Sequence, residues 1–144
     1  MYDCRESEIE IGKGVVLQEG KDVAIIACGV MVSESMKAAE QLTSQGISAT
    51  VIDMHTIKPL DEELITQVAE SCGTIVTAED HNIIGGLGGA VAEFLSSNIP
   101  TPLERVGVKD RFGESGQADE MLDLMEISSP HIASAAIRAI NRKK

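Results

Sequence analysis

The sequence predicts an α/β fold in which helices cover both faces of a mostly parallel sheet. Short runs rich in β-branched residues alternate with longer segments of helical period from Val15 onward, the pattern of βαβ units. The run from Val23 to Cys28 is apolar throughout, as expected for a strand covered on both faces. Because aromatic residues make up only 2% of the chain, the core is expected to consist of Ile, Val, Leu, Ala and Met.

Further strands are predicted over residues 49–54, 74–78 and 103–108. A helix is predicted over residues 33–45, followed by Gly46 at a position suited to left-handed backbone. Its buried face is expected to carry apolar residues spaced by three or four positions, namely Val32, Met36, Ala39 and Leu42.

Three more helices are indicated by their starts. Asp61 precedes acidic residues that favour a helix amino terminus, and a glycine cluster precedes the helix expected over residues 87–97. The closing helix is expected to begin at Ser128 to Pro130, with a hydroxyl cap and a proline in the first turn.

Charge and cysteine content exclude several classes of function. Twelve basic residues against 23 acidic ones give a net charge of −11, which opposes binding to a phosphate backbone, so no nucleic-acid partner is expected. Three widely spaced cysteines, Cys4, Cys28 and Cys72, indicate neither a disulfide framework nor a zinc site, and all three are expected to be reduced. No apolar run reaches the roughly 20 residues of a membrane span, and a cytoplasmic protein is predicted.

Residues 79–89 join a strand end to a helix start, where open α/β sheets place their ligands. Backbone N–H groups at Gly85 and Gly86 could contact a phosphate, but the spacing does not match Gly-x-Gly-x-x-Gly, so a tight turn for packing against a neighbouring domain is favoured. His81 and Asn82 could contribute a phosphate contact or belong to an interface.

Residues 109–116 follow the last strand and combine charges with two glycines, which indicates a shaped loop. Arg111 could bind a phosphate or carboxylate, or form an ion pair with Glu114 or with a neighbouring subunit. Because loops that leave parallel strands emerge on one side, residues 81–89 and 109–116 are expected to be neighbours. A phosphoacceptor domain with Asp53 as its acceptor is disfavoured, because Ala27 and Cys28 stand where a magnesium-binding acidic pair is needed.

Four segments together resemble the carboxy-terminal domain of transketolases, and the likeness extends from Ile11 to the end of the chain. They read DVAIIACGVM at 22–31, VIDMHTIKPLD at 51–61, AEDHNIIGGLGG at 78–89 and VGVKDRFGESG at 106–116. The likeness is greatest to split transketolases, whose carboxy-terminal subunit is a separate chain.

The resemblance implies a three-layer α/β/α domain with a mostly parallel five-stranded sheet and one antiparallel edge strand, over residues 13–144. Gly14 to Leu17 is the candidate for that edge strand. Residues 1–12 are interpreted as an interdomain connection, and the chain looks like a domain excised from a longer polypeptide. The parent enzyme would use thiamine diphosphate and Mg²⁺ to transfer a two-carbon ketol unit between sugar phosphates, as in the pentose phosphate pathway. The sequence contains no Gly-Asp-Gly segment, so no catalytic, cofactor-binding or metal residue is assigned to this domain.

The expected partners are the remaining transketolase domains or subunit and a second subunit of a homodimeric assembly. Two relatives of the same fold remain alternatives: deoxyxylulose-phosphate synthase and the beta subunits of 2-oxoacid dehydrogenases. A free-standing ligand-binding or regulatory domain that uses residues 85–89 is the alternative from another class.

Overall fold

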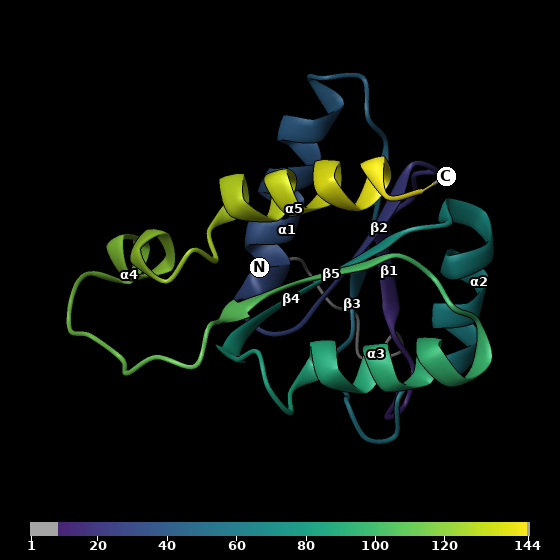
Figure 1. Cartoon of the computed structure of the whole chain (residues 1–144), viewed down its shortest axis with the longest axis horizontal. Coiled ribbons are helices and arrows are strands. Elements are labelled where there is room, and N and C mark those ends of the chain that lie inside the picture. The colour runs from purple at the N-terminus through teal and green to yellow at the C-terminus, as the bar shows by residue number, and fades with distance from the viewer. Residues whose placement is uncertain (1–8, 144) are drawn as a thin grey trace.

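The computed structural model describes residues 9–143 and shows a five-stranded sheet between two layers of helices (Figure 1). The strand order is β1-β3-β2-β4-β5, and β1 alone pairs antiparallel, with β3. Both the mixed sheet and the position of the antiparallel strand at its edge confirm the expected architecture. The strands are β1 (Val15–Gln18), β2 (Val23–Ala27), β3 (Ala49–Asp53), β4 (Ile75–Asn82) and β5 (Leu103–Val108).

Helices cover both faces of the sheet and divide the core into two apolar clusters. One face packs against α1 (Met31–Thr43) and α5 (Ser129–Asn141), and the other packs against α2 (Glu62–Cys72) and α3 (Leu87–Asn98). Because β2 lies between β3 and β4 and contributes alternate residues to both clusters, all five of its residues are buried. This explains its uninterrupted apolar sequence.

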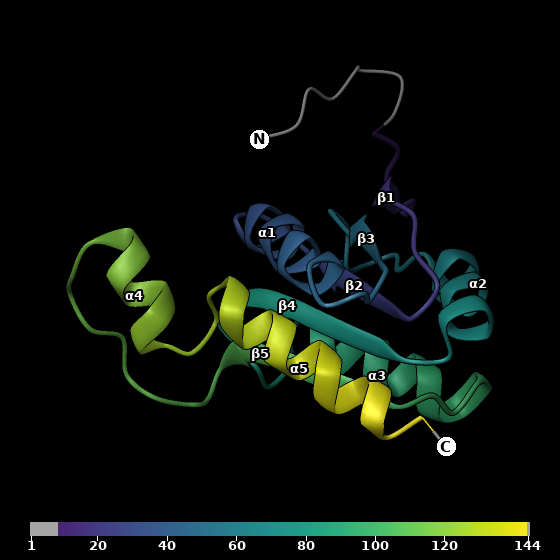
Figure 2. The same ribbon diagram turned by 90° about the horizontal axis from the view of Figure 1, so that it is seen from above.

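A short helix, α4 (Ala118–Leu124), was not expected from the sequence. It lies in a segment that leaves the end of β5, runs away from the sheet and returns to α5 (Figures 1 and 2). We call residues 109–126 the arm. No residue of α4 is fully buried and only Leu122 packs against the core, so α4 lacks the broad apolar face that would have indicated a helix.

Two elements differ from their predicted bounds by two residues or more, for identifiable reasons. The helix expected over residues 33–45 begins earlier, at Met31, because Met31 is itself fully buried, and it ends at Thr43. The strand expected over residues 74–78 continues to Asn82, since a register shift between Ala78 and Asn82 lets β4 resume pairing with Val108 of β5.

The predicted hydroxyl cap of the closing helix is wrong. Ser128 occupies the cap position of α5 but makes no capping hydrogen bond with its side chain. Instead, Oε2 of Glu34, a buried residue of α1, accepts a hydrogen bond of 2.8 Å from the backbone N–H of Ser129. The Ser128 hydroxyl lies 2.8 Å from Nδ1 of His131. A carboxylate from another element therefore stabilises the positive end of α5.

Asp61 caps α2, within the acidic helix start that the sequence predicts. Its Oδ1 accepts a hydrogen bond of 3.1 Å from the N–H of Leu64, and its Oδ2 accepts one of 2.9 Å from the N–H of Gly14. The same carboxylate thus fixes the start of a helix and the entry to β1.

Cys28 and Cys72 are free thiols, whereas the expectation for Cys4 lies outside the described residues. Within residues 9–143, no helix has the length and apolar character needed to cross a membrane.

Candidate functional site

The carboxyl ends of the four parallel strands β2, β3, β4 and β5 lie at the same end of the sheet, and those of β4 and β5 are on the left in Figure 1. The loops at this end cover residues 28–30, 54–61, 83–86 and 109–117, and we call the surface they form the carboxyl edge. Two hydrogen bonds of 2.9 Å join the loops after β4 and β5. They run from Nδ2 of Asn82 to Oδ1 of Asp110 and from the N–H of Ile83 to the oxygen of Val108. The prediction that these two loops are neighbours is confirmed.

His81 and Asn82 lie at the end of β4, where the chain turns toward α3. The Nδ1 atom of the exposed His81 is 2.9 Å from the backbone oxygen of Asn82, so the ring is held to its own loop. Besides binding Asp110, the Asn82 side chain accepts a hydrogen bond of 2.8 Å from the N–H of Ile84. Asn82 therefore shapes the loop as well as joining it to its neighbour.

The start of α3 is stabilised by a carboxylate that the sequence did not single out. Glu79 is 1% exposed, and its two carboxylate oxygens accept hydrogen bonds of 2.8 Å from the backbone N–H groups of Leu87 and Gly88. These N–H groups are the ones that a phosphate at the helix amino terminus would use. An internal anion already binds them, and this favours the packing interpretation of the glycine turn over the phosphate interpretation.

The glycines before α3 answer two different local needs. Gly85 has a φ of 81°, in the left-handed region that residues with a side chain rarely adopt. Gly86 has ordinary backbone, but a Cβ placed on it would overlap Oε2 of Glu79. The turn is therefore built around the buried carboxylate.

Arg111 braces the arm from within. Its Nη2 donates a hydrogen bond of 2.7 Å to Oε1 of Glu114, and its Nη1 donates one of 3.2 Å to the oxygen of Leu124 at the end of α4. The ion pair with Glu114 is one of the two that the sequence suggested. At the base of the arm, the ammonium group of Lys109 pairs with the carboxylate of Glu126. The Lys109 ammonium, as hydrogen-bond donor and as charge, lowers the pKa of Glu126 below its usual value of 4.5.

Exposed apolar side chains gather in the loops of the carboxyl edge. Each of the four loops contributes one of them: Val30 (58% exposed), Ile57 (40%), Ile84 (65%) and Phe112 (96%). Single exposed apolar residues are ordinary on protein surfaces, but several on one edge are typical of a surface that another protein covers. Phe112 is one of only two phenylalanines in the chain.

The same edge is poorly suited to nucleophilic or metal chemistry. Burial raises the pKa of Cys28 to about 11, and the negative charges of Glu79, Asp53 and Asp80 act in the same direction. The thiol is therefore protonated at neutral pH. Across the described part of the chain, no group of His, Cys, Asp and Glu residues is arranged to hold a metal ion.

The fold agrees with comparisons to known proteins. Residues 12–132 match the family model described as transketolase, C-terminal domain. The chain therefore belongs to the transketolase C-terminal domain family, as the four sequence segments indicated. In the solved structure called "split gene transketolase, inactive beta4 tetramer", the similar region has a TM-score of 0.91 and 44% identity, covering 94% of this chain and 45% of that one.

Two relatives show how similar the chain is in sequence to known proteins and how much of each it covers. The chain is 46% identical to the 6-deoxy-6-sulfo-D-fructose transketolase subunit SqwH of Clostridium sp. (strain MSTE9), over 98% of this chain and 44% of the relative. It is 42% identical to 1-deoxy-D-xylulose-5-phosphate synthase of Trichormus variabilis, over 94% of this chain and 22% of that enzyme. The chain thus spans less than half the length of these relatives.

Proposed function

We propose that this chain is the non-catalytic, carboxy-terminal part of a thiamine-diphosphate-dependent transketolase-type enzyme, and that its carboxyl edge and arm bind the rest of that enzyme. The observation that carries the proposal is the extent of the match to the Clostridium subunit, which takes in nearly all of this chain and leaves more than half of the relative unmatched. The partners in this proposal are the remaining transketolase domains or subunit and a second copy of the assembled enzyme.

The apolar side chains of the carboxyl edge support this assignment. Phe112 is almost fully exposed on the arm, which projects from the domain, and Ile84 is exposed on the neighbouring loop. Large apolar and aromatic side chains that project from a braced scaffold are the usual anchors of protein interfaces. His81, Asn82, Gly85, Gly86 and Arg111 belong to this interface in the proposal, as residues that shape or brace its loops.

In this proposal another part of the enzyme holds the cofactor. The pyrophosphate of thiamine diphosphate needs a magnesium ion held by oxygen ligands, and within residues 9–143 no group of three or more His, Cys, Asp and Glu residues is arranged to hold a metal ion. The buried carboxylate of Glu79 is already bound to backbone N–H groups of α3. Transketolases and their relatives depend on thiamine diphosphate in general, so the proposal places the cofactor and Mg²⁺ on the missing part of the enzyme.

The test combines this chain with a transketolase section that carries the thiamine-diphosphate site. Size-exclusion chromatography with light scattering should detect a complex, and ketol transfer should require both components. Replacing Phe112 by Ser should weaken the complex by about tenfold or more, as expected for an aromatic anchor. The matched control is Val16→Thr, an exposed apolar residue of the edge strand at the opposite side of the sheet.

Two results would count against the proposal. Micromolar binding of thiamine diphosphate and Mg²⁺ to this chain alone, measured by calorimetry, would show that it has a cofactor site of its own. Equal affinities of the Phe112 and Val16 variants would show that the arm is not the binding surface.

The identity of the sugar is a separate question. The Clostridium relative is named for a sulfonated sugar and the Trichormus relative for a deoxyxylulose phosphate, so a role in the pentose phosphate pathway stays a prediction. Formation of 1-deoxy-D-xylulose 5-phosphate by the assembled enzyme would identify the synthase as the correct alternative. Action in the cytoplasm is part of the same proposal, and fractionation of cells would test it.

A further inference from the structure

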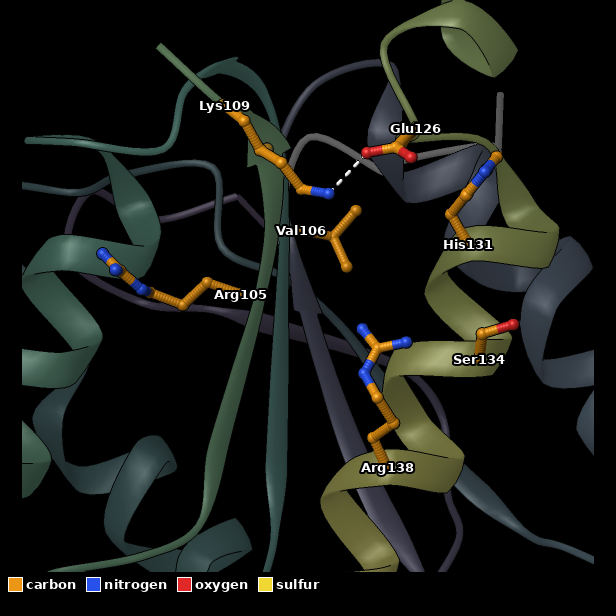
Figure 3. A pocket seen from close by; sticks show the side chains of 8 residues that line it. Arg105, Val106, Lys109, Glu126, His131, Ser134 and Arg138 are labelled. Carbon is orange, nitrogen blue, oxygen red and sulfur yellow. Dashed lines mark hydrogen bonds and ion pairs between the residues drawn. The ribbon is translucent and has the colours of Figure 1, made fainter.

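A small cleft lies between β5 and α5 at the base of the arm (Figure 3). Its volume is about 150 Å³, which corresponds to about five water molecules at the roughly 30 Å³ that each occupies in the liquid. A drug-sized ligand needs about 300 Å³ or more, so the cleft suits a single polar group. Its lining consists of Arg105, Val106, Gly107, Lys109, Glu126, His131, Ser134 and Arg138.

The polar side chains of the cleft come from two directions. His131, Ser134 and Arg138 follow one another at helical spacing on one face of α5, and Lys109 reaches in from the end of β5 (Figure 3). The Arg105 side chain does not point into the cleft. Its guanidinium group lies on the other side of β5 and donates a hydrogen bond to the backbone oxygen of Ile83 (Figure 3).

Two of these groups are held in place by partners that leave donors to spare. Arg138 uses Nε for Glu104, at 3.3 Å, and a guanidinium group has further N–H donors on its two Nη atoms. His131 uses Nδ1 for the hydroxyl of Ser128, so Nε2 is its remaining ring nitrogen. The guanidinium, ammonium and imidazole groups therefore belong to a lining in which the one carboxylate is that of Glu126, while the Ser134 hydroxyl points away from β5 (Figure 3).

We propose that this cleft binds the phosphate group of a small anion. Charge-assisted hydrogen bonds from Arg and Lys are the strongest that a protein offers to phosphate, and here they are combined with an imidazole on a rigid helix. The gathering of basic groups is notable in a chain that carries 23 acidic and 12 basic residues. The bound group has the size of a phosphate, and it can be free phosphate or the end of a phosphate ester.

Binding has a defined competitor within the chain. The ammonium group of Lys109 is paired with Glu126, so an incoming phosphate must share this ammonium or draw it away. Because the same pair joins the two ends of the arm, occupation of the cleft would alter how firmly the arm is held. This inference does not depend on the proposed enzyme, since it concerns the cleft of the chain by itself.

The experiment measures binding of inorganic phosphate and of glycerol 3-phosphate to the 144-residue chain by calorimetry, with sodium chloride at matched ionic strength as the blank. Saturable binding of either compound at one site per chain is expected. Tighter binding of glycerol 3-phosphate would identify an ester as the form recognised, and equal or weaker binding would identify free phosphate.

Two arginines of α5 provide a matched pair of variants. Arg138 and Arg142 lie one turn apart, both pair with Glu104, and only Arg138 lines this cleft. Arg138→Ala should weaken phosphate binding by about tenfold or more, whereas Arg142→Ala, which removes the same charge from the same carboxylate, should leave it within about twofold.

Glu126→Gln should change affinity in the opposite direction, because it removes the competitor for Lys109, and a gain of severalfold is expected. Lys109→Gln serves as a second weakened variant if Arg138→Ala does not fold, since Lys109 is exposed and outside the core. Absence of saturable binding, or equal losses in Arg138→Ala and Arg142→Ala, would overturn the proposal.

Discussion

Oε2 of Glu34 accepts a hydrogen bond of 2.8 Å from the backbone N–H of Ser129, although 95 residues separate the two in sequence. The bond joins the buried face of α1 to the first turn of α5 across one layer of the domain. Glu79 and Asp61 act in the same way on α3 and α2. Three buried carboxylates thus satisfy N–H groups at three helix starts, where unpaired donors and the positive end of the helix dipole favour an anion.

Glu34 should make stability depend on pH in the acidic range. Burial by itself raises its pKa, but the Lys37 ammonium and the N–H of Ser129 outweigh burial and hold the pKa below its usual value of 4.5. A depressed pKa contributes stability that is fully present above 4.5 and is lost as the pH falls through the folded-state value. In urea unfolding, Glu34→Gln should therefore be less stable than the parent chain near neutral pH. The gap should narrow below pH 4.5, and a gap that stays constant with pH would contradict this assignment.

Replacement of Glu79 by Ala should lower the free energy of unfolding by about 2 to 3 kcal/mol, since it leaves two buried N–H donors unpaired and removes a helix cap. Glu93→Ala, at an exposed position of the same helix, is the control and should change stability by less than about 0.5 kcal/mol. Thermal and chemical unfolding of both variants measure the difference. Equal losses would mean that the Glu79 carboxylate has no special role.

The glycines of residues 85–89 should differ sharply in their tolerance of alanine. A Cβ on Gly86 would overlap the carboxylate of Glu79, whereas a Cβ on Gly89, within α3, would meet nothing within 4 Å. Gly86→Ala should displace Glu79 and destabilise the chain by about 1 to 3 kcal/mol. Gly89→Ala should be neutral or stabilise it by up to about 1 kcal/mol through helix propensity. The two melting temperatures, compared with that of the parent chain, decide the point.

Arg111→Ala should loosen the arm while leaving the domain intact. The side chain binds Glu114 and the end of α4, and these hydrogen bonds do not involve Met125, the one residue of the arm that is buried in the core. Hydrogen exchange of the amides in residues 118–124 should become faster, and global stability should change by less than about 0.5 kcal/mol. Arg142→Ala, which removes an arginine elsewhere on the surface, should leave exchange in the arm unchanged.

The sequence predicts the layers of this fold well because burial leaves a direct trace in it. The apolar run Val23 to Ala27, and the spacing of Ala39 and Leu42, each follow from facing the core. Glu34 and Glu79 leave no such trace, because an acidic residue in a helix or at a strand end is usually exposed. One sequence feature could have pointed to Glu79. The helix that begins at Leu87 follows glycines and has no Ser, Thr, Asp or Asn at its cap position, so an acceptor for its first N–H groups was to be sought in another element.

The candidate site was predictable in position but not in its internal contacts. Parallel strands place the loops after β4 and β5 side by side, which follows from chain direction alone. The bond between Asn82 and Asp110 depends on a register shift in β4, and the brace from Arg111 to Leu124 depends on a helix that has no buried face. Neither feature has a pattern that local sequence reveals.

The ion pair between Lys109 and Glu126 joins the first and last residues of the arm, so the arm forms a closed loop. The entropy of closing such a loop rises only slowly with its length, by about 0.6 kcal/mol for each doubling. Residues can therefore be added to or removed from the middle of the arm at small cost to folding, provided that both ends keep their charges. The length and sequence of this one segment can thus change while the sheet and its buried carboxylates stay the same.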